Sequence, residues 1–128
     1  MAELATKDIR NIALLGHGSE GKTTLTEAML FAAGLVDRQG KVEDGTTVSD
    51  YDPEEAKRSI SISASVAPLT WKNNKINVID VPGYFDFIGE AIAALRVVET
   101  AGIVVGAVSG VTEASSDSVL TSSGSSLI

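Results

Sequence analysis

The sequence predicts an α/β fold in which helices flank a mostly parallel β-sheet. Short apolar runs, of the kind that buried parallel strands need, alternate with segments of helical periodicity. A glycine-rich turn joins the first apolar run to the first helical segment, and a later apolar run ends in an aspartate followed by Pro-Gly. The order strand, glycine-rich loop and helix is typical of domains that bind a polyphosphate.

Length and composition narrow the class of protein. The 128 residues suffice for one small domain, and a hydrophobic content of 44% allows a core. Without cysteine the chain has no disulfide framework or thiolate metal site, which suits a reducing compartment. There is no signal-peptide pattern, and no apolar run reaches the ~18–20 residues that span a bilayer. The net charge of −7 argues against a basic face for nucleic acid. We expect a soluble cytoplasmic protein without membrane contact or direct nucleic-acid binding.

The first predicted strand, residues 9–15, runs into the pattern G-x-x-x-x-G-K-[ST], which here reads Gly16-His17-Gly18-Ser19-Glu20-Gly21-Lys22-Thr23. Glycines let successive backbone N–H groups point at phosphate oxygens, and the start of the next helix adds its unpaired amides. We expect the Lys22 ammonium to contact the terminal phosphates and the Thr23 hydroxyl to ligate Mg²⁺. An ordinary strand-to-helix turn has no need of Gly-Lys-Thr, so the pattern predicts a P-loop NTPase.

A helix over 22–33 is predicted next, because apolar residues recur on one side of it and Gly34 follows as a stop signal. Residues 35–59 are then polar and without periodicity. A connection of that length is uncommon in a compact domain unless it is functional or disordered. We interpret it as a switch segment that orders over the terminal phosphate, with a plain solvated loop as the alternative.

Alternation over 60–71, a polar turn at 72–75 and an apolar run at 76–81 predict a half-buried hairpin. Its second strand ends in Asp80-Val81-Pro82-Gly83, where Asp80 is placed to hold a Mg²⁺ water and the Gly83 amide to approach a phosphate. The same four residues occur in ordinary turns. Their position at a strand end, downstream of the phosphate loop, favours a role in nucleotide binding.

The remaining pattern predicts a helix over 86–101 and a buried parallel strand over 103–108. Residues 112–128 contain many serines, no lysine or arginine and no periodicity. We expect them to form a disordered or foreign tail. The predicted organisation is thus a partial nucleotide-binding domain over 1–111 and a tail over 112–128. The strand over 103–108 would then lack a neighbour and leave an apolar edge.

Taken together, the motifs resemble the N-terminal GTP-binding domain of translational GTPases of the elongation factor G type, including the elongation-factor-G-like branch of that group. The resemblance rests on residues 16–24, 58–62 and 80–87 and covers about 7–111. It implies a GTP-binding and GTP-hydrolysing domain that takes GTP or GDP with Mg²⁺. It also implies action on the ribosome during elongation, at translocation.

The resemblance also implies roles for individual residues. It places Ser61 where the family has a switch threonine that ligates Mg²⁺, so Thr23, Ser61 and Asp80 become the candidate metal ligands. Asp80 and Gly83 would be contacts of the second switch. The residues that line the phosphates would be Gly16, His17, Gly18, Ser19, Glu20, Gly21, Lys22, Thr23 and Thr24. For His17 a structural role in the turn is favoured over catalysis, because backbone amides bind the phosphates there.

Two departures from the family pattern bear on catalysis. Ser59 and Ser61 replace a glycine and the threonine, and Tyr84 stands where the family usually has the histidine that positions the attacking water. A neutral phenol can hydrogen-bond a water but supplies no imidazole, although the elongation-factor-G-like branch is similar in carrying tyrosine. With Lys22 and Tyr84 as the candidate catalytic residues, we predict slow intrinsic hydrolysis.

Guanine recognition in this class uses an Asn-Lys-x-Asp motif, and these 128 residues contain none. Asn74-Lys75-Ile76-Asn77 lacks the aspartate and precedes Asp80. The residues themselves therefore predict phosphate and Mg²⁺ chemistry in an incomplete domain, and guanine specificity rests on the resemblance. Two alternatives stay open: a GTPase of the ribosomal-protection type, and a truncated nucleotide-binding remnant without efficient turnover.

Overall fold

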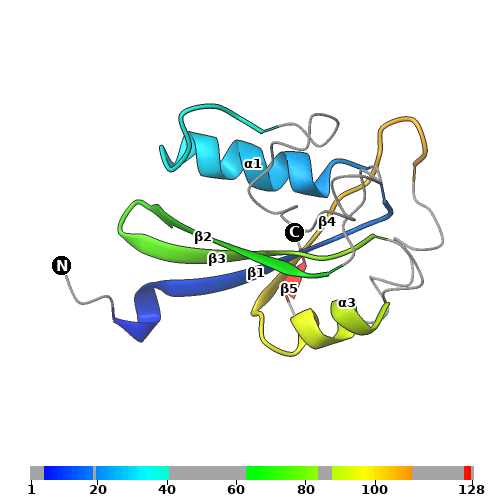
Figure 1. The fold of residues 1–128 in the computed structure, drawn as a ribbon. Helices are drawn as coiled ribbons and strands as arrows, with labels where there is room; N and C mark the ends of the chain where they lie inside the picture. Colours follow the sequence, from blue (N-terminus) through cyan, green and yellow to red (C-terminus); the bar gives the residue numbers. More distant parts are fainter. Residues whose placement is uncertain (1–4, 19, 41–62, 84–87, 111–125, 128) are drawn as a thin grey trace.

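The computed structural model describes residues 5–18, 20–40, 63–83, 88–110 and 126–127. Within them five strands form one sheet, with one helix on each face (Figure 1). The elements in chain order are η1 (Thr6–Asp8), β1 (Ile9–Leu15), α1 (Lys22–Ala32), β2 (Ser65–Trp71), β3 (Asn74–Asp80), α3 (Ile88–Leu95), β4 (Thr100–Ile103) and β5 (Ser126–Leu127).

The strand order is β2-β3-β1-β4-β5, and the predicted α/β fold with a mostly parallel sheet is confirmed. Strand β1 pairs in parallel with β3 and β4, β5 pairs in parallel with β4, and only β2 of these five runs antiparallel. Because β1, β3 and β4 run the same way, their carboxyl ends meet at one edge of the sheet, on the right in Figure 1. Open parallel sheets bind ligands at this edge.

The predicted hairpin is present as β2 and β3, but β2 begins at Ser65 rather than at residue 60, and residues 60–62 lie outside the described part. Its turn contains Lys72 and Asn73 with φ of 47° and 65°, and positive φ at both central residues is what a two-residue type I′ turn requires. Strand β2 is half-buried, but through Ala67 and Leu69 rather than through Val66, which is 62% exposed. The reason is that α1 covers one face of this edge strand, whereas α3 packs over β1 instead.

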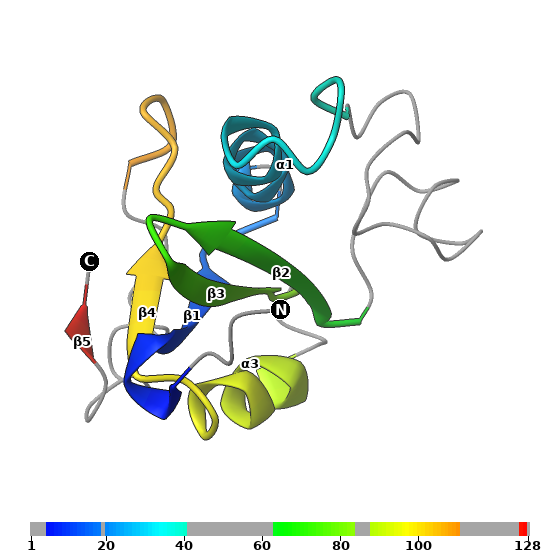
Figure 2. The same cartoon turned by 90° about the vertical axis from the view of Figure 1, so that its left-hand side faces the viewer.

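Two apolar clusters hold the helices on the sheet, and alternate residues of each strand supply them. Figure 2 shows the arrangement along the strands, with α1 above the sheet and α3 below it. Leu14 and Val78 pack with Leu30 of α1 on one face. Ala13 and Ile79, their neighbours in sequence, pack with α3 on the other face.

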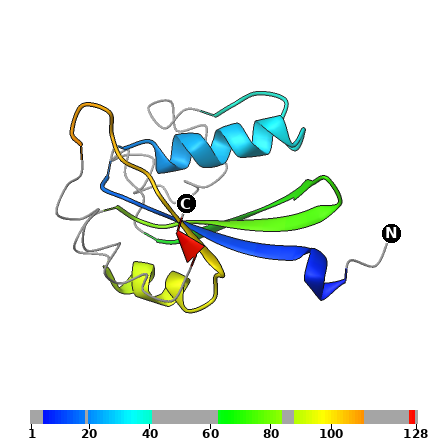
Figure 3. The ribbon, with the colours of Figure 1, turned by 180° about the vertical axis from the view of Figure 1, so that it is seen from behind.

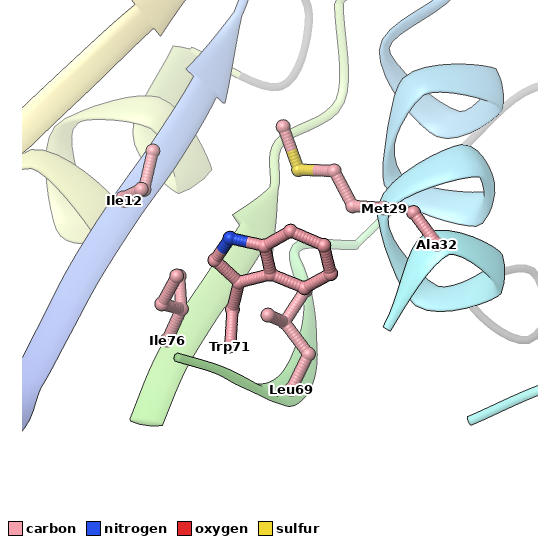
Figure 4. A pocket seen from close by; sticks show the side chains of 6 residues that line it. All are labelled: Ile12, Met29, Ala32, Leu69, Trp71 and Ile76. Atoms are coloured by element: carbon pink, nitrogen blue, oxygen red, sulfur yellow. The ribbon is translucent and has the colours of Figure 1, made fainter. Parts of the chain in front are cut away.

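At the end of the sheet away from the strands' carboxyl ends, α1 and the hairpin leave an apolar cavity of about 250 Å³. Side chains from three strands and α1 converge on it, and Trp71, 47% exposed, lies among them (Figure 4). The lining residues are Ile12, Met29, Ala32, Leu69, Trp71 and Ile76. Trp71 is the last residue of β2, so it packs directly beside the hairpin turn.

The second predicted helix ends earlier than expected, at Leu95; residues 86 and 87 lie outside the described part. The N–H groups of Arg96 and Val97 bond to carbonyls three residues back, which tightens and ends the helix. The Glu99 carboxylate then accepts hydrogen bonds from the backbone N–H of Asn11 (2.8 Å) and from its Nδ2 (3.2 Å). Both hydrogen bonds lower the pKa of Glu99, and the bond from the backbone N–H of Asn11 contributes most. They fix the chain at the start of β4.

The strand predicted over 103–108 is wrong in position, because β4 covers Thr100–Ile103. A turn follows, closed by a 2.9 Å hydrogen bond from the Gly110 N–H to the Gly106 carbonyl. Val108 is fully exposed on it. The apolar edge expected beside this strand is partly paired, since β5, red in Figure 3, runs beside Thr100 and Ala101. Residues 112–125 of the predicted tail lie outside the described part. Among the described helices, none has the length and apolar character of a membrane span.

Candidate nucleotide-binding site

The predicted phosphate loop lies at the carboxyl edge of the sheet, between β1 and α1. Gly21 is the residue before α1 and has φ 93°, a left-handed conformation that favours glycine. Gly16 has φ 143°, and a Cβ on it would lie 2.3 Å from the carbonyl oxygen of Val104. Both glycines of the pattern are thus required by backbone geometry, as the sequence predicted. Ser19 lies outside the described residues.

Lys22 is buried inside this loop, with 6% of its surface exposed. Its Nζ donates hydrogen bonds to the carbonyl oxygens of His17 (2.9 Å) and Gly16 (3.1 Å). Burial lowers the pKa of Lys22 from its usual 10.5, while the nearby Asp80 and Glu20 carboxylates oppose this shift. The loop therefore holds a desolvated cation at its centre, where its attraction for a polyphosphate is little screened by water.

Thr23 and Asp80 meet although 57 residues separate them in sequence. The Thr23 Oγ1 donates a 2.6 Å hydrogen bond to Asp80 Oδ2, and Asp80 is 1% exposed at the end of β3. A hydroxyl and a carboxylate are the hard oxygen donors that Mg²⁺ takes in nucleotide sites. The two predicted metal ligands therefore fit the ion. The third, Ser61, lies outside the described residues.

The segment after β3 closes against the loop through Gly83. The N–H of Gly18 donates to the Gly83 carbonyl over 3.1 Å. A Cβ at Gly83 would lie 2.3 Å from the Lys22 Nζ and 2.4 Å from the Gly18 nitrogen. Only a residue without a side chain fits here, so Gly83 joins the predicted site, in contact with the loop. Tyr84, the next residue, lies outside the described part of the chain.

The remaining loop residues have structural contacts. His17 is exposed, and its Nδ1 lies 2.8 Å from the Gly18 carbonyl oxygen, so Nδ1 donates when it carries the proton. This contact supports the structural role favoured for His17. Thr24 lies on the exposed side of α1, and its backbone carbonyl accepts a 3.3 Å hydrogen bond from Gln39 Nε2. The Glu20 side chain contacts the loop backbone and a distant serine.

One buried acid near the site was missed in the sequence. Glu27 of α1 is 1% exposed, and one of its carboxylate oxygens accepts the N–H of Gly40 over 3.2 Å. Glu27 lies one helical turn after Thr23, so the i, i+4 spacing could have shown that both share a helix face. It fixes the chain at residue 40, inside the predicted switch segment over 35–59, of which residues 41–59 lie outside the described part.

Comparisons with known proteins agree with this geometry. The family model for the elongation factor Tu GTP binding domain matches residues 7–125. Elongation factor G 2 of Streptomyces coelicolor is 45% identical over 111 residues, which are 87% of this chain and 16% of that protein. The mitochondrial ribosome-releasing factor 2 of Meyerozyma guilliermondii is 43% identical over 109 residues, 85% of this chain and 13% of that protein.

A crystal structure of a Thermus thermophilus protein superposes with a TM-score of 0.86 at 40% identity, covering 90% of this chain and 17% of that one. The chain thus spans less than a fifth of the length of the proteins it matches. The division of the chain at residue 111 stays a prediction. Because this family model matches residues 7–125, most of the chain, the chain belongs to the family of the elongation factor Tu GTP-binding domain, and within it the chain is similar to elongation factor G proteins.

Proposed function

We propose that this domain binds GTP and GDP with Mg²⁺ and hydrolyses GTP on the ribosome, in the cytoplasm, during the translocation step of elongation. The observation that carries the proposal is the cluster at the carboxyl edge of the sheet. There a buried Lys22 lies inside the glycine loop, next to the Thr23–Asp80 pair. The relatives named elongation factor G 2 and ribosome-releasing factor 2 support the ribosome as the partner.

In this proposal the residues of the chain bind and orient the polyphosphate. On binding, the Lys22 ammonium gives up its hydrogen bonds to two loop carbonyls and donates to phosphate oxygens instead. Because the ammonium is already buried in the free protein, binding requires little further desolvation of its charge. Thr23 and Asp80 would hold Mg²⁺, which offsets negative charge on the phosphates during transfer. Gly83 allows the second switch to lie directly against Lys22.

The proposed hydrolysis is slow without a partner. Tyr84 stands in place of the usual histidine, and a neutral phenol orients a water through hydrogen bonds alone. Tyr84→Phe should therefore slow single-turnover GTP hydrolysis while leaving GTP affinity unchanged. An unchanged rate would remove Tyr84 from the mechanism.

Nucleotide titration tests the binding proposal. Fluorescent GDP, GTP and ATP analogues are titrated into the chain with Mg²⁺ and with EDTA. We expect saturable binding that is tighter with Mg²⁺ than with EDTA and that prefers guanine. Lys22→Met should abolish it, whereas Lys7→Met, which removes an exposed lysine, should not. Equal affinity for ATP would contradict guanine specificity, and absence of binding to all three would overturn the proposed function in favour of a remnant.

The similarity to ribosome-releasing factor 2 supports a second candidate for the ribosomal step. Its identity of 43% is close to the 45% of elongation factor G 2. GTP hydrolysis by this chain should be measured with elongating ribosomes and with ribosomes stalled after termination. Stimulation mainly by the first favours translocation, and stimulation mainly by the second favours ribosome release.

A further inference from the structure

One side chain of the loop, Glu20, forms contacts that the phosphate-binding pattern does not explain. The x positions of the pattern carry no requirement for an acid. A negative charge in this loop repels a polyphosphate and lowers the affinity for it. The Glu20 carboxylate must therefore have another role if it is to favour binding. In the structure both of its carboxylate oxygens are engaged, one inside the loop and one outside it.

Inside the loop, Glu20 Oε2 accepts the backbone N–H of His17 over 3.0 Å. The carbonyl of His17 in turn accepts the Lys22 Nζ over 2.9 Å. His17 is therefore held on both sides by side chains from the second half of the same loop. This crosslink closes the loop around the position of Lys22.

Outside the loop, Glu20 Oε1 accepts the hydroxyl of Ser109 over 3.2 Å, across 89 residues of sequence. Ser109 lies in the turn after β4, which Figure 1 shows beside the start of α1. The turn is itself tightly built, because a Cβ at Gly106 would lie 2.5 Å from the Ser109 Oγ and 3.6 Å from Glu20 Cγ. Directly before the turn, the Val104 N–H bonds to the Leu15 carbonyl over 2.8 Å. Glu20 thus fastens a glycine-rich loop to a fixed part of the sheet.

We propose that Glu20 is a positioning residue, whose carboxylate fastens the phosphate loop in its binding shape through the His17 N–H and the Ser109 hydroxyl. This inference rests on the proposed nucleotide binding. Preorganisation of this kind raises affinity because the loop loses less freedom when the ligand arrives. The turn after β4 becomes part of the nucleotide site, although it carries none of the recognised motifs.

The test uses the whole 128-residue chain and a fluorescent GDP with Mg²⁺. Glu20→Ala should weaken binding about 10-fold, as expected for a lost charge-assisted hydrogen bond. Ser109→Ala should weaken it ~3-fold, and the double variant should be no weaker than Glu20→Ala alone, since both act through one contact. Glu20→Gln keeps an acceptor for His17 and should stay within ~3-fold of wild type. Asp8→Ala, which removes an acid directly before β1, at the opposite end of that strand from the loop, is the matched control.

Amide hydrogen exchange at His17, measured without nucleotide, separates this inference from the proposed function. Exchange should be faster in Glu20→Ala and near wild type in Glu20→Gln. Wild-type affinity in Glu20→Ala, or additive effects of the two single variants, would overturn the positioning role. If the wild-type chain binds no nucleotide, the proposed function fails, and His17 exchange alone decides whether Glu20 holds the loop. Unaltered exchange in Glu20→Ala would then reject it.

Discussion

The two ends of the sheet are built in opposite ways. At the carboxyl edge, charged and polar groups are buried against one another: Lys22 and Asp80 are 6% and 1% exposed, and glycines allow contacts no side chain permits. At the far end, α1 and the hairpin leave an apolar cavity of about 250 Å³ beside a half-exposed Trp71. The dense polar packing at one end fits the proposed nucleotide binding, and the apolar packing at the other end contributes to folding. Substitutions should therefore separate nucleotide affinity from stability.

After the loss of Lys22 itself, Gly83→Ala should have the largest effect on binding. The new Cβ would lie 2.3 Å from Lys22 Nζ and 2.4 Å from the Gly18 nitrogen, so the lysine or the loop must move. We expect a loss of ~100-fold in Mg²⁺–GDP affinity, measured by fluorescence titration.

Gly89→Ala is the matched control. No atom lies within 4 Å of a Cβ at Gly89, which is in helix α3. This change should leave affinity unaltered and raise the free energy of unfolding by about 0.5–1 kcal/mol. An equal loss of affinity in both variants would mean that Gly83 is not part of a site.

The same contrast explains what the sequence could and could not predict. The bounds of β1 and the start of α1 were predictable because the loop pattern ties them to specific glycines. The hairpin was predictable from its polar turn. The end of α3 was not, because Val97 and Val98 continue the apolar pattern of the helix past Leu95. The tight turn at Arg96 and Val97 ends the helix, and the hydrogen bonds between Asn11 and Glu99 then fix the start of β4.

Within the site, residue types in the pattern predicted Lys22, Thr23, Asp80 and Gly83. Side-chain direction was not predictable, so Glu20 was assigned to the phosphates through its place in the loop alone. Its partner Ser109 is 89 residues away in sequence, and no local pattern links the two. The motif predicts which residue types surround the phosphates, but it does not predict contacts between residues far apart in sequence, such as Glu20 and Ser109.

Asp80→Asn should have the next largest effect. It removes the buried charge opposite Thr23 while keeping the size of the side chain. Mg²⁺-dependent affinity for GDP should fall ~10-fold or more, and affinity measured in EDTA should change little. Asp8→Asn, directly before β1 and at the opposite end of that strand from the loop, should change neither. Retention of full Mg²⁺ dependence in Asp80→Asn would show that this carboxylate has no part in holding the ion.

Thr23→Ser and Thr23→Val sharpen the same point. Serine keeps the hydroxyl that donates to Asp80 and should keep most of the Mg²⁺ dependence. Valine keeps the shape but not the donor and should lose several-fold in affinity. If both variants behave alike, the hydroxyl is not what matters at this position.

The pH dependence of stability should show the buried Lys22. Burial lowers its pKa below 10.5, so between the folded-state pKa and 10.5 the unfolded chain binds a proton that the folded chain does not. The stability of wild type relative to Lys22→Met should therefore rise with pH across that window. Urea unfolding of the two proteins at a series of alkaline pH values measures this difference. Lys7→Met, at an exposed lysine, should show no such slope, and a flat difference for Lys22→Met would mean that burial does not depress this pKa.

Trp71→Ala, at the far end, should have the smallest effect on binding and a visible one on stability. Full removal of a buried aromatic costs about 3–5 kcal/mol, and Trp71 is 47% exposed beside an existing cavity, so we expect ~1–2 kcal/mol. The chain has one tryptophan, so unfolding must be followed by circular dichroism in urea rather than by its fluorescence. Trp71→Phe should lose less than half as much, because most of the apolar contact remains. GDP affinity should stay within ~2-fold of wild type in both variants, since Trp71 lines the cavity with apolar neighbours and none of the loop residues. A larger change in affinity would mean that a change in packing under α1 alters the phosphate loop, which lies at the amino-terminal end of that helix. The two ends of the sheet would then be energetically coupled.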